Sequence, residues 1–398
     1  MESTMLAKWE WKKLLRDWKT RILLVAFFLF YATFSLLYQQ QTVSFPQERM
    51  KDQYDNIHRL FNTVPSSDFS GKTGQEVYDI LADLQMQYGM QLYILTRQEG
   101  NTITGFENIF SDYLEYGTQI AHNQARLLEL EDFTYHEYLM NFMPDEETIR
   151  RDVQFYDYLA KHDLSIEWNS FSASNIFLQE VHLIIGFSLF LFIALLAGDR
   201  FTKDQVKNWS ITHGLPVPWR KQWHLRAAQL WLLVWLTSLS GLLTSYIISL
   251  FIESPGSLMY PVMTYTPFGY IPIAIWLYAI LAIVLAMLLS VFLILLTLGL
   301  SWVFRTIYLT MMATIGWYFI PMLWQTIDPI SSWQPSLYLH IEPVLDGTSA
   351  DAFGLPGIHF LKALVPLLLL ILLVEALFAK IFDRIQTQTL GLKRRTTE

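Results

Sequence analysis

Six apolar stretches, each almost free of charged side chains, recur along the 398 residues of this chain. A helix needs about 20 consecutive apolar residues to cross the hydrocarbon core of a bilayer. Hydrophobic residues make up 53% of the chain, which is too many for a soluble domain of ordinary composition. We therefore predict an all-α polytopic membrane protein with spans at 22–38, 176–197, 227–252, 272–300, 307–324 and 360–378.

The distribution of Lys and Arg between these spans predicts their orientation, because short basic loops remain on the cytoplasmic side of a membrane. Basic side chains concentrate in residues 1–21, 198–226 and 379–398. Acidic residues outnumber basic ones more than twofold in 39–175, and 325–359 has neither Lys nor Arg. The pattern predicts a multi-pass plasma-membrane protein with both termini cytoplasmic. Segments 39–175 and 325–359 are predicted to be extracellular.

The amino-terminal segment, residues 1–21, has the pattern of an amphipathic interface helix. On a helical wheel Lys8, Lys12 and Arg16 lie on one face, and apolar residues that include Trp11 lie on another. Such a helix rests among lipid head groups, where its cations meet anionic lipid. The alternative is a basic anchor that only orients the following span.

Two segments outside the predicted spans carry structure of their own. Residues 39–175 are long enough to bury a separate core, and apolar residues from Val77 to Tyr88 recur at helical spacing, so we predict a mainly helical extracellular domain. The apolar patches of 325–359 are too short to span a bilayer. We expect them to dip into the outer leaflet as a re-entrant segment that protein shields from lipid.

The charged loop at 198–226 separates the second and third predicted spans. Residues Lys203–Thr212 can form a short helix, and Gly214 followed by Pro216 and Pro218 ends it, because Gly suits a helix C-cap and Pro cannot continue a helix. One interpretation is an ordinary basic inner loop. The other is a docking surface for a cytosolic partner.

The residues needed for familiar catalytic and cofactor sites are missing from the sequence. Cysteine is absent, and neither an HExxH metal motif nor a GxxxxGK[ST] phosphate loop occurs. The ionisable residues Glu180, His182, Lys362 and Glu375 fall near span ends, where side chains can reach the interface, which favours structural roles. We predict a transport subunit rather than an enzyme, with no metal, no cofactor of its own and no nucleic-acid partner.

The layout of the chain resembles the permease subunits of type-2 ATP-binding-cassette (ABC) exporters. The shared features are the basic amphipathic helix, the six spans, the loop ending in LPVPWR (Leu215–Arg220) and the apolar segment 325–359. The resemblance implies that Phe201–Thr212 is a coupling helix, which fits a groove on an ATPase subunit. Many relatives have Glu and Gly before the turn, where this chain has Asp204 and Asn208.

The same resemblance implies the contact residues and partners. Residues 215–221 would form the turn back to the third span. The implied contacts with the ATPase are Phe201, Lys203, Asp204, Lys207, Asn208, Trp209, Leu215, Pro216 and Arg220. The implied partners are two copies of a cytosolic ABC ATPase, which would hold ATP and Mg²⁺, a second copy of this chain or a related permease, and membrane lipid.

In the family, the first, second and fifth spans line the seam between two permease subunits, and closure of the ATPases tilts them as rigid bodies. The matching aromatic residues here are Phe27, Phe34, Phe187, Phe190, Trp317 and Phe319. An aromatic seam with few charges suits export of a hydrophobic peptide, a lipid-like molecule or a drug. Alternatively these aromatic side chains face lipid.

Two other functions fit the same sequence. In a sensor or scaffold, the outer domain would bind a ligand such as an antimicrobial peptide and the inner loop would recruit a signalling protein. The second function is that of an ion exporter of the same family, although the predicted spans of this chain hold few charges. The acidic outer domain itself either guides cationic peptides by long-range attraction or forms a solvated lid.

Overall fold

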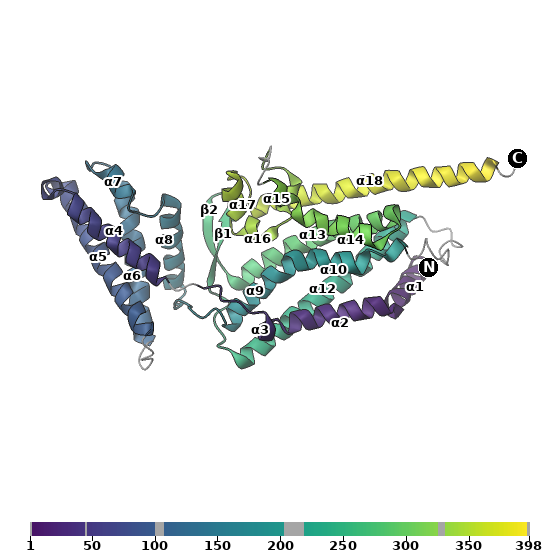
Figure 1. Ribbon diagram of the computed structural model, residues 1–398, viewed down its shortest axis with the longest axis horizontal. Coiled ribbons are helices and arrows are strands. Elements are labelled where there is room, and N and C mark those ends of the chain that lie inside the picture. The colour runs from purple at the N-terminus through teal and green to yellow at the C-terminus, as the bar shows by residue number, and fades with distance from the viewer. Residues whose placement is uncertain (1, 44–45, 100–106, 203–218, 325–330, 396–398) are drawn as a thin grey trace.

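The computed structural model describes residues 2–43, 46–99, 107–202, 219–324 and 331–395, and it is mostly helical. A bundle of long helices forms one part of the molecule, and a helical domain projects from one end of it (Figure 1). We call this end of the bundle the domain end and the opposite end, where the amino-terminal helix lies, the α1 end.

The bundle contains α1 (Glu2–Arg16), α2 (Trp18–Ala32), α3 (Phe34–Leu37), α9 (Ala173–Ile185), α10 (Phe187–Ala197), α12 (Trp219–Ile252), α13 (Ile275–Phe304), α14 (Ile307–Gly316), η3 (Trp317–Phe319), α15 (Ile320–Trp324) and α18 (Phe360–Arg395). The domain contains α4 (Gln47–Thr63), η1 (Ser66–Phe69), α5 (Lys72–Glu99), α6 (Glu107–Glu129), α7 (His136–Met140) and α8 (Glu146–Lys161).

Within the described residues, four helices are long and apolar enough to cross a membrane, and a fifth candidate arises if α9 and α10, bent by 47° at their junction, are one span. The four are Arg220–Ile252, Ile275–Phe304, Ile307–Trp324 and Phe360–Phe382. This agrees with an all-α polytopic protein. The predicted first span, 22–38, is divided, because Thr33 leaves the helical conformation and the 15 residues of α2 fall short of a full crossing.

Helix α13 is the centre of the bundle and contacts α9, α10, α12, α14 and α18. Its apolar residues face protein on most sides, and its few hydroxyl groups are paired: Ser290 accepts from Trp235 (2.9 Å), and Thr297 bonds Thr314 (3.0 Å). At Gly299 a methyl group would lie 2.4 Å from the ring of Phe378. The missing side chain therefore lets α13 and α18 pack closely.

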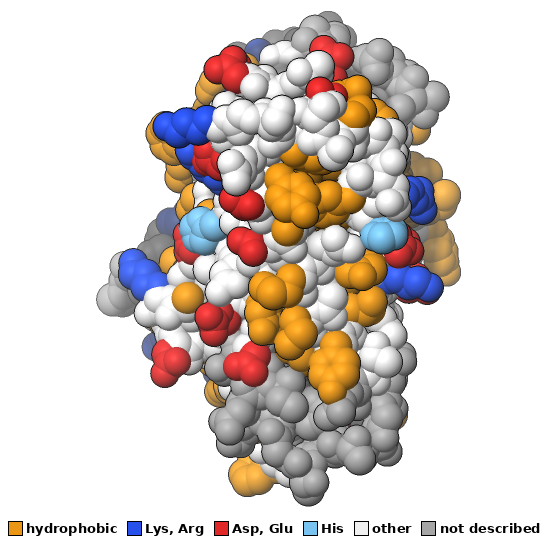
Figure 2. Space-filling model, turned by 90° about the vertical axis from the view of Figure 1, so that its left-hand side faces the viewer, with side chains coloured by type: hydrophobic (Ala, Val, Ile, Leu, Met, Phe, Trp, Pro, Cys, Tyr) orange, Lys and Arg blue, Asp and Glu red, His pale blue; other side chains and the backbone are white. Residues whose placement is uncertain are grey.

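The helical domain has a core of its own. Apolar residues from α4, α5, α6 and α7 fill it, and they include Leu60, Leu81 and Leu84, which are fully buried. The predicted helical character of residues 39–175 is therefore observed. Figure 2 shows apolar side chains along the middle of the domain's outer face with acidic side chains around them.

One face of α5 exposes large apolar side chains to solvent. Tyr78, Met86, Met90 and Tyr93 are between 39% and 55% exposed, although α5 also carries several core residues. Their spacing places them along one side of the helix. We call these four residues the α5 stripe.

The chain enters and leaves the domain at one place on the bundle. The backbone N–H of Val43 donates to the hydroxyl of Ser170 (2.8 Å). The side chain of Gln179 on α9 donates to the backbone carbonyls of Gln40 and Ser170, both at 3.0 Å. The two connecting segments are therefore tied to each other and to α9.

A β-hairpin lies between α12 and α13, in a stretch rich in Pro and aromatic residues. Strands β1 (Pro261–Thr266) and β2 (Gly269–Ala274) pair antiparallel, and the hydroxyl of Thr266 donates to the carbonyl of Gly269 across the turn. Gly269 has φ +99°, which side chains disfavour. Because β2 occupies 269–274, α13 begins at Ile275 rather than at the predicted 272.

Residues 331–359 cover the domain end of the bundle. They form η4 (Pro335–Tyr338), α16 (Ile341–Leu345) and α17 (Thr348–Phe353). Among these residues, most large apolar side chains are buried against α13 and α18, with Leu339 and Leu345 fully enclosed, whereas Trp333 is 55% exposed. The segment is therefore packed onto protein through short helices.

Candidate functional site

A cavity of about 700 Å³ opens between α2–α3 and α9–α10. Its wall is mainly aromatic and aliphatic, with polar groups toward the domain end. The lining residues are Ala26, Phe27, Phe30, Phe34, Tyr38, Gln40, Thr42, Gln179, His182, Leu183, Gly186, Phe187, Ser188, Leu191, Tyr318 and Glu342. We call it the α2–α9 cavity.

The break between α9 and α10 shapes this cavity. Gly186 has φ −85° and ψ −145°, which ends α9, and the chain resumes as α10 at Phe187. The hydroxyl of Ser188 donates to the carbonyl of Leu183 (2.5 Å), a group that the interrupted helix leaves without its usual partner. The same hydroxyl lies 3.2 Å from that of Tyr31 on α2, which ties the break to the neighbouring helix.

A contact between a histidine and a carboxylate lies at the polar side of the cavity. His182 Nδ1 lies 3.0 Å from Glu342 Oε1 on α16, and His182 Nε2 lies 3.1 Å from the hydroxyl of Tyr278. The hydrogen bond from His182 lowers the pKa of the Glu342 carboxyl, and it outweighs partial burial, which acts in the opposite direction. The imidazole therefore links α9 to α13 and α16.

The structure brings three of the six predicted seam residues, Phe27, Phe34 and Phe187, to the α2–α9 cavity. Phe190 is fully buried behind its wall, where its ring contacts that of Tyr318 (5.2 Å between centroids). The other two, Trp317 and Phe319, are not among the residues that line the cavity.

The remaining pair of seam residues belongs to η3. Trp317 packs edge-on against Phe292 of α13 (5.2 Å), away from the cavity. Phe319 is 47% exposed and lies 6.4 Å from the ring of Phe187 at the cavity wall. Whether any of the six contacts a partner subunit stays a prediction.

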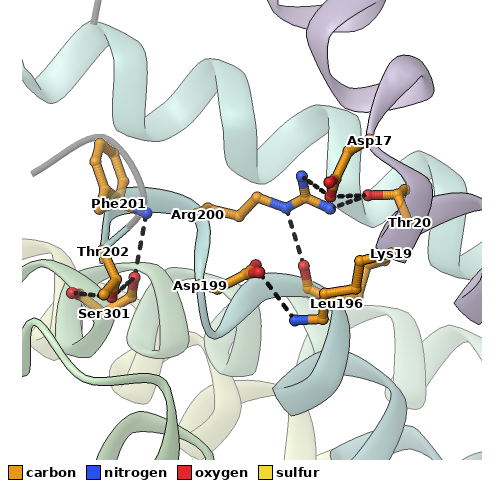
Figure 3. A network of polar contacts seen from close by, with 9 residues as sticks. All are labelled: Asp17, Lys19, Thr20, Leu196, Asp199, Arg200, Phe201, Thr202 and Ser301. Carbon is orange, nitrogen blue, oxygen red and sulfur yellow. Dashed lines mark hydrogen bonds and ion pairs between the residues drawn. The ribbon is translucent and has the colours of Figure 1, made fainter. Parts of the chain in front are cut away.

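At the α1 end, polar contacts join the amino-terminal helices to α10 (Figure 3). Arg200 extends between α10 and α2, where its guanidinium lies 3.4 Å from Asp17 and 2.5 Å from the hydroxyl of Thr20. Lys19 pairs with the buried Asp199 (3.1 Å). Two ion pairs therefore fix the start of α2 to the residues that follow α10; in one the cation belongs to the α2 side, and in the other the anion does.

A third ion pair joins α1 to α12 and is almost fully buried. Arg226 Nη2 lies 2.8 Å from Glu10 Oε1, and the two side chains are only 4% and 5% exposed. Arg226 also donates to the backbone carbonyl of Arg200 and lies over the ring of Phe201, 4.6 Å from its centroid. Gln229 donates to the carbonyl of Ala7. We call the three pairs Glu10–Arg226, Asp17–Arg200 and Lys19–Asp199 the α1 clamp.

Contacts other than the α1 clamp also hold both flanks of residues 203–218 to the bundle. On one flank, the backbone of Phe201 donates to the Ser301 hydroxyl (3.2 Å) and Thr202 donates to the Ser301 carbonyl (3.1 Å). On the other flank, Arg220 pairs with Glu375 of α18 (2.6 Å). The segment therefore starts and ends on residues that are fixed to α10, α12, α13 and α18.

Most of the predicted coupling contacts fall outside the described residues. These are Lys203, Asp204, Lys207, Asn208, Trp209, Leu215 and Pro216, together with most of the predicted coupling helix. The predicted turn at 215–221 needs correction, because Trp219, Arg220 and Lys221 already belong to α12. Residues 219–226 contain neither Gly nor Pro, so the helix can begin directly after Pro218, well before the predicted third span at 227.

Sequence reasoning missed the acidic half of the α1 clamp. Glu10 and Asp17 are the rare acidic residues of a basic segment, and the sequence interpretation counted Arg200 and Arg226 only as loop charges. An acidic residue on an otherwise basic helix was the available signal. Among the residues that the structure describes, no group of three or more His, Asp and Glu could hold a metal ion.

Comparison with known proteins finds no matching family model, no matching curated protein and no matching solved structure. The function must therefore be inferred from the residues of this chain.

Proposed function

We propose that this chain is the membrane-spanning permease subunit of an ATP-driven exporter of the type-2 ABC class. The observation that best supports the proposal is the α1 clamp, which ties the flank before residue 203 to α2, a helix that lines the α2–α9 cavity, and the flank after residue 218 to α1. In this proposal the subunit spans the plasma membrane with both termini cytoplasmic. It works with two cytosolic ATPase subunits, which hold ATP and Mg²⁺, and with a second copy of itself or a related permease.

The clamp gives a direct route from the loop to the cavity. Helix α10 begins at Phe187 in the cavity wall and ends at Ala197, three residues before the clamp residue Arg200. Helix α2 carries Thr20, which Arg200 contacts, and also Phe27, which lines the cavity. A push on residues 203–218 would therefore move two walls of the cavity together. Rigid-body tilting of packed helices is a common form of such switching.

The cavity suits an amphipathic cargo. Its volume of about 700 Å³ lies within the range of small-molecule sites, roughly 300–1,000 Å³. Phe27 and Phe187 offer apolar surface, while His182, Gln179 and Glu342 offer hydrogen bonds at one side. A hydrophobic peptide, a lipid-like molecule or a drug with one polar end fits this division better than a hydrated ion does.

The proposal is tested by coexpressing the chain with an ABC ATPase encoded beside its gene. We expect the two to copurify and the ATPase to be stimulated. Replacing residues 203–212 with Gly-Ser repeats should abolish stimulation and leave Phe201 and Thr202 anchored to Ser301. A Gly-Ser replacement of equal length in the carboxyl-terminal tail, 389–398, is the control. No association with the parent chain, or equal stimulation by both variants, would contradict the proposal.

A second candidate function, a sensor of cationic amphipathic peptides, is favoured by the α5 stripe. The exposed carboxylates of Asp79 and Asp83 lie on the same helix as these exposed apolar side chains. A cationic peptide could place its apolar face on the stripe and its charges near the acids. In the full chain, Met86→Ser together with Met90→Ser should weaken binding of such a peptide, measured by fluorescence. Unchanged affinity would exclude the stripe as the binding surface.

A further inference from the structure

A buried carboxyl group lies inside the bundle without a matching cation. Glu180 on α9 is 0% exposed. Within the described residues, neither of its carboxylate oxygens has a hydrogen-bond partner of ordinary geometry, although the side chain of Ser245 on α12 lies beside it. The sequence suggested a side chain that reaches the interface. The expectation was wrong because α9 already begins at Ala173 and Glu180 faces the neighbouring helices.

An ionised carboxylate in this position would be costly. Transfer of an isolated charge into an apolar protein interior is so unfavourable that the group takes up a proton instead, unless a counter-charge is present. Ionisable residues at the depth of a membrane-spanning helix are therefore rare and usually have a function. Glu180 meets this description in a helix pair that counts as a candidate span.

Hydroxyl groups on α2 and α12 lie near Glu180. Tyr31 on α2 is close enough to interact electrostatically with the Glu180 carboxyl, and the Tyr31 hydroxyl lies beside the side chain of Ser238 on α12. The hydroxyl of Ser245 accepts a hydrogen bond from the backbone N–H of Ser35 (3.3 Å). Ser238 and Ser245 are two helical turns apart, so both face α2 and α3.

Two hydroxyl groups in this region can form further hydrogen bonds. The side-chain oxygens of Ser35 and Ser238 are buried and lack a hydrogen-bond partner of ordinary geometry among the described residues. Buried polar groups of this kind are the usual partners of internal water. Water at these positions would complete a hydrogen-bonded path between Tyr31 and Glu180.

The path continues to the α2–α9 cavity. Ser188 lines that cavity, and its hydroxyl lies 3.2 Å from the hydroxyl of Tyr31. Tyr31 itself is fully buried behind the cavity wall. The Ser188 and Tyr31 hydroxyls therefore connect the cavity to the interior where Glu180 lies.

We propose that Glu180 is a proton-binding site inside the bundle and that it is loaded from the α2–α9 cavity through the hydroxyls of Ser188 and Tyr31. A hydronium ion in the cavity gives a proton to Ser188 and becomes water. The Ser188 hydroxyl turns away from the Leu183 carbonyl and passes its own proton to Tyr31, and Tyr31 passes its proton through internal water to Glu180. Each hydroxyl and each water of the path gains one O–H bond and loses one. The carboxylate gains one O–H bond and becomes neutral.

Among the described residues, the titratable side chains near this part of α9 on the neighbouring elements are Tyr31 on α2, Tyr246 on α12, Tyr278 on α13, Glu342 on α16 and Asp346 at the end of α16. None of these five is a Lys or Arg. On α9 itself, His182 is directed to Glu342 and Tyr278. The proposal is independent of the exported cargo and of the ATPase.

Infrared spectroscopy of the full chain in lipid nanodiscs tests the site directly. We expect a C=O stretching band of a protonated carboxyl at neutral pH that Glu180→Gln removes and that disappears at alkaline pH. Glu342→Gln is the matched control and should leave the band in place. Transfer to D₂O should shift the band, and Tyr31→Phe should slow this exchange by about 100-fold, the scale of a lost proton-transfer group.

Several results would overturn the proposal. A neutral-pH spectrum of Glu180→Gln identical to that of the parent chain would mean that Glu180 is ionised. A band that persists at every pH would identify a permanently neutral structural acid. Loss of the band on adding NaCl at constant pH would assign the site to sodium. Unchanged deuterium exchange in Tyr31→Phe, in a variant that retains the parent's thermal stability, would rule out the path through Tyr31.

Discussion

Glu10→Gln removes the carboxylate from the most deeply buried pair of the α1 clamp. Arg226, which is 4% exposed, would then lose the carboxylate that lies 2.8 Å from its guanidinium. Removing one partner of a buried ion pair costs about 3–5 kcal/mol. This corresponds to a decrease of about 150-fold to 5,000-fold in the ratio of folded to unfolded protein.

The test is reversible unfolding of the purified chain in mixed micelles, with SDS as the denaturant. Glu375→Gln is the control, because Arg220 in the Arg220–Glu375 pair is 59% exposed and such pairs contribute about 1 kcal/mol or less. Combining Glu10→Gln with Arg226→Met removes both charges and should recover about half of the loss. If Glu10→Gln is no more destabilising than Glu375→Gln, or if the double variant is the sum of its single variants, the buried-charge reasoning is wrong.

Three further outcomes are expected. Gly299→Ala should destabilise the bundle by about 1–3 kcal/mol because the new methyl group meets Phe378, whereas Gly316→Ala, with nothing within 4 Å, should be neutral or stabilising; thermal unfolding compares them. The folded-state pKa of Glu342 is lowered, so its contribution to stability is present at neutral pH and is lost as pH falls through that pKa. Glu342→Gln should therefore flatten the acid side of a plot of unfolding temperature against pH, and an unchanged slope would contradict this. Gln179→Ala should make the segments that connect to the domain more sensitive to protease, and equal cleavage rates would count against their attachment.

The long apolar stretches could be predicted because the apolar character of each stretch by itself indicates burial in lipid or protein. The run that became α13 is apolar on every face, and the structure buries it among five other helices. Helix breaks were harder to foresee. Neither Thr33 nor Gly186 belongs to a pattern that excludes a continuous span, and both breaks depend on contacts with neighbouring helices, such as that between Ser188 and Tyr31.

Pairings between distant residues could not be read from the sequence. Glu10 and Arg226 are 216 positions apart, and each alone looks like an ordinary charge near a membrane. The aromatic residues proposed for the seam were chosen by span, so Phe27, Phe34 and Phe187 reached the cavity while Phe190 turned inward. Side-chain direction within a span depends on packing, which hydropathy does not record.

The shared attachment point of the helical domain has a consequence for how this chain can be rebuilt. Because Val43 and Ser170 are hydrogen-bonded to each other, a short Gly-Ser bridge between them could replace everything in between without stretching the bundle. The domain is thus an interchangeable module. Grafting a different domain between Val43 and Ser170 would show which functions belong to the domain and which belong to the helical bundle.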